Sequence, residues 1–239
     1  MQKLFIDYTP EKNIILDGEE ARHIAKSLRM KVGDMLTVTD GGGEDYGCLI
    51  TQITKDTVTL EVCYKQANGS EPSCKVTIYQ GVPKSTKTED IIQKCVELGV
   101  YRIVPTLTKR SVSRPDEKSA NKKNQRYKKI ALEAAQQSGR GIIPEISPQT
   151  TLKQALAEDS AKKKIVFYEG GGDKLKDIIS PDDDEVSIYI GPEGGFEPEE
   201  VEAIVSAGGR RATLGPRILR TQTAPVAALT AIMLLTDNM

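Results

Sequence analysis

Two glycine-containing segments in the last quarter of the chain have the residue types of ligand-binding loops. The first, Gly191-Pro-Glu-Gly-Gly-Phe196, follows the apolar run 186–190 and precedes a helix that we expect near Pro198. Glycine allows close backbone approach or a positive φ, and a helix N-terminus offers free N–H donors. The segment lacks the Lys-Ser/Thr of a P-loop and the spacing of a dinucleotide motif, so phosphate binding has weak support.

The second segment is Leu214-Gly-Pro-Arg-Ile-Leu-Arg-Thr-Gln-Thr-Ala-Pro225, and a strongly apolar helix follows it. Thr221 or Thr223 would cap that helix, and Pro225 would occupy its first turn, where a missing N–H costs nothing. On these facts alone, two tight strand-to-helix turns without a ligand remain an alternative to a binding site.

From residue 75 onward, strand patterns alternate with helix patterns. Strands are expected at 76–80, 102–107, 164–168, 186–190 and 211–214, and helices at 88–98, 124–138, 152–157, 198–207 and 224–235. This alternation predicts an α/β domain with a mostly parallel sheet covered by helices. Since ligands bind at the carboxyl ends of such strands, the chemistry is expected in the loops after residues 168, 190 and 214.

The first seventy residues show a different pattern, in which short strands are interrupted by one helix. Strands are expected at 4–6, 14–16, 35–39, 47–53 and 58–64, and the helix at 18–28. This describes a small β-barrel. Gly, Ser, Glu and Pro cluster at 68–73, so the expected domains are residues 1–72 and 73–239.

Positive charge is concentrated in one stretch, although the formal net charge is −1. Residues 109–140 contain 10 Lys and Arg against 3 Asp and Glu, whereas residues 1–72 contain 8 against 12. A basic stretch of this kind is either a phosphate-binding surface or a solvated helix face with a basic loop. Charge alone leaves both interpretations open.

Several function classes are disfavoured by composition. No apolar run reaches the ~18 residues of a membrane span, and the start of the chain lacks a secretory pattern. We therefore expect a cytoplasmic protein without membrane contact. The four cysteines have no C-x-x-C spacing and His23 is the only histidine, so neither a metal site nor a disulfide is expected.

In combination, the two glycine-containing segments resemble the signature of the RsmE family, SPOUT-class enzymes that methylate N3 of a uridine in small-subunit ribosomal RNA. Other stretches of the chain are similar to the family's pattern and occur in the same order. They are Pro83-Lys84, Lys94-Cys-Val-Glu-Leu-Gly99, Lys109-Arg-Ser111, Glu133-Ala-Ala-Gln-Gln-Ser-Gly-Arg140, and in the first domain His23-Ile-Ala-Lys-Ser-Leu-Arg29 with Gly33-Asp34. The resemblance covers nearly the whole chain. One departure is Gln222, where the family usually has glutamate.

The resemblance implies a PUA-like N-terminal barrel, a C-terminal SPOUT domain with a deep trefoil knot, and a homodimer with its active site between two subunits. The apolar helix at 224–235 also favours a dimer, because it needs burial on more than one face. The implied cofactor is S-adenosyl-L-methionine, recognised mainly by main-chain groups. The residues assigned to it are Phe167, Glu169, Gly191, Pro192, Glu193, Gly194, Gly195, Leu214, Gly215, Ile218 and Leu219.

Methyl transfer to N3 needs a uridine that has lost its proton. Arg140 and Arg220 are the candidates for stabilising the uridine anion, and a phosphate contact is the alternative for each. We assign no general base, because Gln222 cannot replace a glutamate in that role.

The partner implied is ribosomal RNA or the small ribosomal subunit. Its expected contacts are Arg22, His23, Arg29, Lys109, Arg110, Arg114, Lys122, Lys123 and Arg126. Two other functions stay open: a related methyltransferase with another RNA target, and an RNA-binding protein without catalysis.

Overall fold

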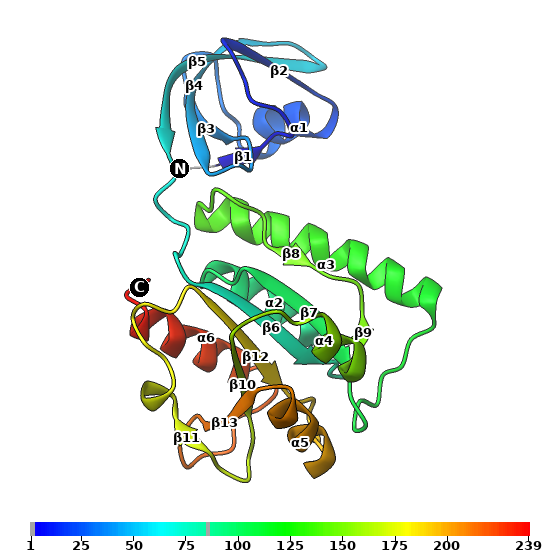
Figure 1. The fold of residues 1–239 in the computed structure, drawn as a ribbon. Helices are drawn as coiled ribbons and strands as arrows, with labels where there is room; N and C mark the ends of the chain where they lie inside the picture. Colours follow the sequence, from blue (N-terminus) through cyan, green and yellow to red (C-terminus); the bar gives the residue numbers. More distant parts are fainter. Residues whose placement is uncertain (1–2, 85–86) are drawn as a thin grey trace. The chain divides into compact units, whose positions relative to one another are not determined.

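The computed structural model describes residues 3–84 and 87–239, which divide into two units (Figure 1). One unit contains the chain up to Glu71 together with Ala135–Ile143, and the other contains Pro72–Ala134 and Pro144–Met239. The division after Glu71 lies one residue before the boundary that the sequence predicts. The return of the chain to the first unit at Ala135–Ile143 is not predicted by the sequence.

The first unit is a strongly curved five-stranded sheet with the strand order β1-β3-β4-β5-β2 (Figure 1). β1 is parallel to β3, and the other neighbouring pairs are antiparallel. Side chains alternate as in half-buried strands, and two register shifts in β4 bend the sheet. The strands are β1 (Lys3–Phe5), β2 (Asn13–Asp17), β3 (Met35–Thr39), β4 (Glu44–Ile53) and β5 (Thr57–Ala67).

One helical segment follows β2. It begins as α1 (Gly18–Arg22) and continues as a π-helical turn, η1 (His23–Ser27), where the sequence predicts a single helix over 18–28. Ala21 and Ile24 anchor it in the core of the first unit.

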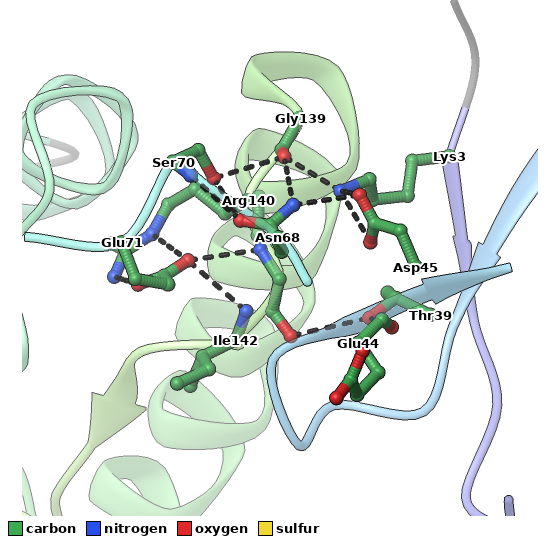
Figure 2. Close-up of polar contacts among 12 residues, drawn as sticks. Lys3, Thr39, Glu44, Asp45, Asn68, Ser70, Glu71, Gly139, Arg140 and Ile142 are labelled. Carbon is green, nitrogen blue, oxygen red and sulfur yellow. Dashed lines mark hydrogen bonds and ion pairs between the residues drawn. The ribbon is translucent and has the colours of Figure 1, made fainter. Parts of the chain in front are cut away.

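A buried polar network holds the end of a long helix within the first unit (Figure 2). The Lys3 ammonium pairs with the Asp45 carboxylate at 2.7 Å and donates to the Gly139 carbonyl at 2.8 Å. The Asn68 amide also donates to Asp45, at 2.8 Å. These contacts join β1, β4 and the residues after β5 to the segment at 139, which explains why Ala135–Ile143 belongs to this unit.

The second unit is built on a parallel sheet with the strand order β11-β13-β10-β12-β6-β7-β8, and β9 pairs with β7. Its strands are β6 (Lys75–Gly81), β7 (Arg102–Leu107), β8 (Glu145–Ile146), β9 (Thr150–Thr151), β10 (Lys163–Phe167), β11 (Asp173–Lys174), β12 (Glu185–Ile190) and β13 (Gly209–Thr213). β6 and β12 are buried almost throughout, as strands covered on both faces should be.

Helices pack on both faces of this sheet. On one face, α4 (Leu152–Glu158) and α5 (Pro198–Ser206) cover a cluster that includes Tyr79 and Tyr189, whose rings stack at 4.6 Å between centroids. The neighbouring strand residues point to the other side. There α6 (Ala224–Leu235) contacts β6 and α2 (Lys87–Glu97).

The longest helix, α3 (Glu117–Ser138), begins seven residues before the start that the sequence predicts at 124. The Asp116 carboxylate accepts from the Ser119 N–H at 2.8 Å, which caps the helix. The Lys-rich residues after it have good helix propensity, so residues 117–123, which the sequence leaves outside the helix, are helical, whereas residues 108–116 form a loop. β8, β9 and β11 are also missing from the prediction, because two-residue strands carry no periodicity.

Candidate active site

A cleft of about 330 Å³ lies at the carboxyl ends of three strands in the second unit. It is lined by residues 167–169 at the end of β10, by the loop after β12, and by the segment that follows β13. These strands are neighbours in the order β13-β10-β12. Parallel pairing therefore brings together the three loops in which the sequence predicts the chemistry.

All the residues assigned to the cofactor from the resemblance line this cleft, with the exception of Gly194. Gly194 is exposed, and a Cβ added there would meet the Arg110 side chain at 3.2 Å. The sequence assignment does not include Lys87 and Arg217, which line the cleft as well. Arg217 lies inside the second glycine-containing segment, and this position was the sequence signal that could have assigned it to the site.

The main chain of the loop after β12 is tightly folded. A Cβ on Gly191 would come within 2.9 Å of the Gly195 backbone, and Gly195 itself has a φ of +70°. The Gly195 N–H donates to the Pro192 carbonyl at 2.9 Å. Side chains at either glycine would change this turn, so the glycines leave main-chain atoms at the edge of the cleft.

Thr221 connects the two main loops of the cleft. Its hydroxyl donates to the Gly191 carbonyl at 2.9 Å and accepts from the Gln80 amide at 3.1 Å. Both side chains are buried. Thr223 is the N-cap residue of α6 and Pro225 lies in its first turn, as the sequence predicts, but the Thr223 side chain makes no capping hydrogen bond.

Glu193 lines the cleft, but its carboxylate is engaged by the start of α2. It accepts from the Lys84 N–H at 3.1 Å and from the Lys87 ammonium at 2.8 Å. Burial alone would raise the pKa of Glu193, but these hydrogen bonds outweigh burial and lower it below the ordinary value. Glu193 therefore anchors the loop as an anion.

Arg217 and Arg220 line the cleft and are exposed, and neither forms an ion pair within residues 3–84 and 87–239. Their charges are available to an anionic ligand. Gln222 lies beside them, and its Oε1 atom is buried without a hydrogen-bond partner in the described part of the chain.

Arg140, the other arginine that the sequence suggests for catalysis, has a structural contact in the first unit (Figure 2). It is 4% exposed, and its guanidinium donates to the Glu71 carboxylate at 2.6 Å. The same carboxylate accepts from the Gly141 N–H at 2.9 Å. Among the described residues, Arg140 is not one of those that line the cleft.

The basic residues expected to bind RNA fall into three groups. Arg22, His23 and Arg29 are exposed in the first unit, and Arg29 has a φ of +54°, which is uncommon for a residue other than glycine. Lys122, Lys123 and Arg126 are exposed on α3, where Arg126 pairs with Glu89 at 2.7 Å. The third group, Lys109, Arg110 and Arg114, makes contacts within the second unit.

The described residues contain neither a candidate metal site nor a candidate membrane span. No cluster of His, Cys, Asp and Glu side chains there is arranged to hold a metal ion. No helix in that part of the chain combines the length and apolar character needed to cross a membrane.

Comparison with protein families identifies both units. Residues 70–233 match a family described as an RNA methyltransferase domain, and residues 16–63 match an RNA methyltransferase PUA domain. The chain is 37% identical to the ribosomal RNA small subunit methyltransferase E of Bacillus subtilis (strain 168), over 99% of this chain and 98% of the relative.

Solved structures agree with these matches. The chain has a TM-score of 0.91 and 28% identity to a ribosomal RNA small subunit methyltransferase E from Neisseria gonorrhoeae bound to S-adenosyl methionine, over 98% of both chains. It has a TM-score of 0.88 and 29% identity to a putative methyltransferase from Legionella pneumophila in complex with the same cofactor, over 98% of this chain and 96% of that one. The protein therefore belongs to the ribosomal RNA small subunit methyltransferase E family of RNA methyltransferases with a PUA domain.

Proposed function

We propose that this chain transfers the methyl group of S-adenosylmethionine to N3 of a uridine in the 16S RNA of the small ribosomal subunit. The observation that carries the proposal is the cleft at the ends of β10, β12 and β13, which is lined by both family motifs. The cofactor named for the Neisseria and Legionella structures and the RNA named for the Bacillus relative support it.

The lining of the cleft fits this cofactor. Gly191 and Gly195 leave a main-chain cradle that a Cβ would disturb, while Phe167, Leu214 and Ile218 supply apolar surface. Main-chain donors and acceptors beside apolar walls suit a nucleoside with an uncharged base. When bound, S-adenosylmethionine supplies an electrophilic methyl group on a sulfonium.

Arg220 is the residue that we propose for catalysis. Its exposed guanidinium at the cleft would stabilise the negative charge of a uridine that has lost its N3 proton. Gln222 is a neutral amide and accepts no proton at neutral pH, so it is no general base. Holding two reactants in near-attack geometry lowers the activation barrier by ~7–11 kcal/mol. A positioned general base accelerates a reaction ~10²–10⁴-fold, which corresponds to only about 3–5 kcal/mol. Positioning and charge therefore account for the larger share of the rate.

RNA contacts are proposed for the exposed cations outside the cleft. Lys122, Lys123 and Arg126 present positive charge along α3, and Arg22 and Arg29 do so in the first unit, where the exposed His23 imidazole is proposed as a further polar contact. Phosphate contacts of this kind give affinity without sequence choice and make binding dependent on salt.

A second copy of the chain is proposed as a partner. α6 is apolar nearly all round and buries Ala228, Leu229 and Ile232 in its own unit, yet Leu234 stays 58% exposed. Ile218, in the segment before α6, is 84% exposed. Exposed apolar side chains at the cleft and near the end of α6 support a homodimer.

We also propose that the chain between β13 and α6 forms the knot that the family resemblance implies. A further proposal is that the protein acts in the cytoplasm, where it meets ribosomal subunits.

The proposed function is tested by methyl transfer. Purified protein is incubated with S-adenosylmethionine carrying an isotopically labelled methyl group and with small ribosomal subunits from cells that lack this protein. Digestion and mass spectrometry of the RNA should find one labelled 3-methyluridine. Arg220→Ala should lower kcat strongly at an unchanged cofactor affinity, whereas Lys153→Ala, an exposed residue of α4, should match the wild type.

Other results would support the alternatives. Label on a different atom or in a different RNA would indicate a related methyltransferase with another target. Absence of label, with RNA binding intact, would indicate an RNA-binding protein without catalysis.

A further inference from the structure

Arg110 makes three hydrogen bonds to the loop between β12 and α5. Its Nε and Nη2 atoms donate to the Glu197 carboxylate at 2.8 and 3.1 Å, and its Nη1 atom donates to the Gly194 carbonyl at 2.5 Å. A planar guanidinium bound along two edges has a single orientation, which a lysine ammonium cannot reproduce. Arg110 therefore fixes two residues of this loop at once.

The main chain beside Arg110 is attached to the same loop. The Lys109 N–H donates to the Glu200 carboxylate at 2.7 Å, and Glu200 is 6% exposed. The other oxygen of this carboxylate accepts from the Glu197 N–H at 2.9 Å, as part of the capping box of α5. The turn at 108–111 thus supports the beginning of α5.

The two adjacent glycines of the loop face different surroundings. A Cβ on Gly194 would meet the Arg110 side chain at 3.2 Å, whereas a Cβ on Gly195 would meet the Glu169 carboxylate at 3.6 Å. Gly195 and Glu169 line the cleft, and Gly194 does not. Arg110 therefore contacts the side of the loop that is turned away from the cleft.

The acidic neighbours of Arg110 also set it apart from the cations on α3. The hydrogen bond from Arg110 lowers the pKa of Glu197, so this carboxylate stays charged beside it at neutral pH. A phosphate would have to displace both Glu197 and the Gly194 carbonyl. Lys122 and Lys123, by contrast, are exposed and form no ion pair within the described residues.

We propose that Arg110 is a positioning residue of the cofactor site, whose guanidinium holds Gly194 and Glu197 so that the Gly195 main chain faces the cleft. The proposal rests on the proposed function in taking S-adenosylmethionine as the ligand. An exposed ion pair contributes little to folding stability. Removal of Arg110 should therefore change the loop more than the fold.

The test compares Arg110→Ala, Arg110→Lys and Glu197→Gln with Lys122→Ala, a control that removes one exposed cation. Two properties are measured for each protein: the cofactor Kd by calorimetry and the salt dependence of RNA binding. A third measurement, amide hydrogen exchange of residues 191–197 without cofactor, needs no ligand. Melting curves establish that each variant is folded.

We expect both Arg110 variants and Glu197→Gln to weaken cofactor binding at least fivefold and to accelerate exchange in the loop. The double variant Arg110→Ala/Glu197→Gln should bind the cofactor no more weakly than either single variant, because the two residues act through the same contact. The salt slope should fall for Lys122→Ala and stay unchanged for Arg110→Ala.

A lysine variant with normal cofactor affinity and loop exchange, or an alanine variant that loses only salt-dependent RNA affinity, would overturn the proposal. A wild-type protein that binds no S-adenosylmethionine would contradict the proposed function instead. The exchange measurement would then decide the role of Arg110 by itself.

Discussion

Thr221 belongs to one loop of the cleft and hydrogen-bonds to another, through the Gly191 carbonyl. On its other side it accepts from the Gln80 amide, which lies at the end of β6. A single hydroxyl therefore connects three segments that are far apart in the sequence. No spacing rule relates residues 80, 191 and 221, so the sequence predicts the two motifs but not the bond between them.

Replacement of Thr221 by valine should weaken cofactor binding about five- to tenfold, or ~1–1.4 kcal/mol. Valine keeps the shape but leaves the Gly191 carbonyl without its donor. Thr221→Ser keeps the hydroxyl and should bind like the wild type. Calorimetric titration of both variants measures the difference, and equal affinities for valine and threonine would show that the bridge does not position the loops.

Glycine was the clearest signal of the cleft in the sequence, because a positive φ such as that of Gly195 favours glycine, although Gly194 does not line the cleft. Charged residues were less predictable. Glu193, Arg110 and Arg140 all lie in motifs, yet each makes an ion pair within its own unit. The sequence does not record whether a charged side chain faces water, a ligand or another side chain, because long-range packing decides which of these surrounds it.

Sequence pattern predicted the existence of α3 but neither its first turns nor the unit to which its end belongs. Its Lys-rich first turns have charge but little apolar periodicity, and its last residues, with the segment to Ile143, join the first unit. Contacts to Lys3 and Glu71 cause this return of the chain. By contrast, the bounds of α6 match the prediction at 224–235, since its apolar run has clear ends.

The network at the end of α3 gives a prediction for the stability of the first unit. Asp45→Ala leaves the Lys3 ammonium, whose side chain is 6% exposed, without its counter-charge, and should cost ~3–5 kcal/mol. Asp56→Ala, at an exposed position, should stay within about 0.5 kcal/mol of the wild type. Hydrogen exchange of the β4 amides reports the unfolding of this unit. A change below about 1 kcal/mol for Asp45→Ala would mean that solvent or a neighbour compensates Lys3.

At the scale of the whole molecule, the alternation of strands and helices was sufficient to predict a parallel sheet and the edge that carries the cleft. The order of the strands was not predictable from the sequence. β10 lies between β12 and β13 in the sheet, although β12 and β13 follow each other in the chain. Pairing of distant segments depends on packing that no local pattern records.

The proposed homodimer predicts that light scattering finds twice the chain mass of 26.1 kDa at micromolar concentration. Leu234→Glu should favour the monomer, because it places a charge on the exposed part of α6 without disturbing buried residues. Lys153→Glu, on exposed α4 surface, is the matched control and should remain dimeric. A wild-type protein that scatters only as a 26.1 kDa species would contradict the dimer.

Calorimetric titration of S-adenosylmethionine into Gly195→Val measures whether the loops after β12 and β13 bind this cofactor. Gly208→Val is the control, because Gly208 also has a positive φ, of +89°, but does not line the cleft. If the loops do, Gly195→Val should bind the cofactor at least tenfold more weakly, by about 1.4 kcal/mol, and Gly208→Val should bind it like the wild type. A folded Gly195→Val protein with normal cofactor affinity would contradict binding by these loops.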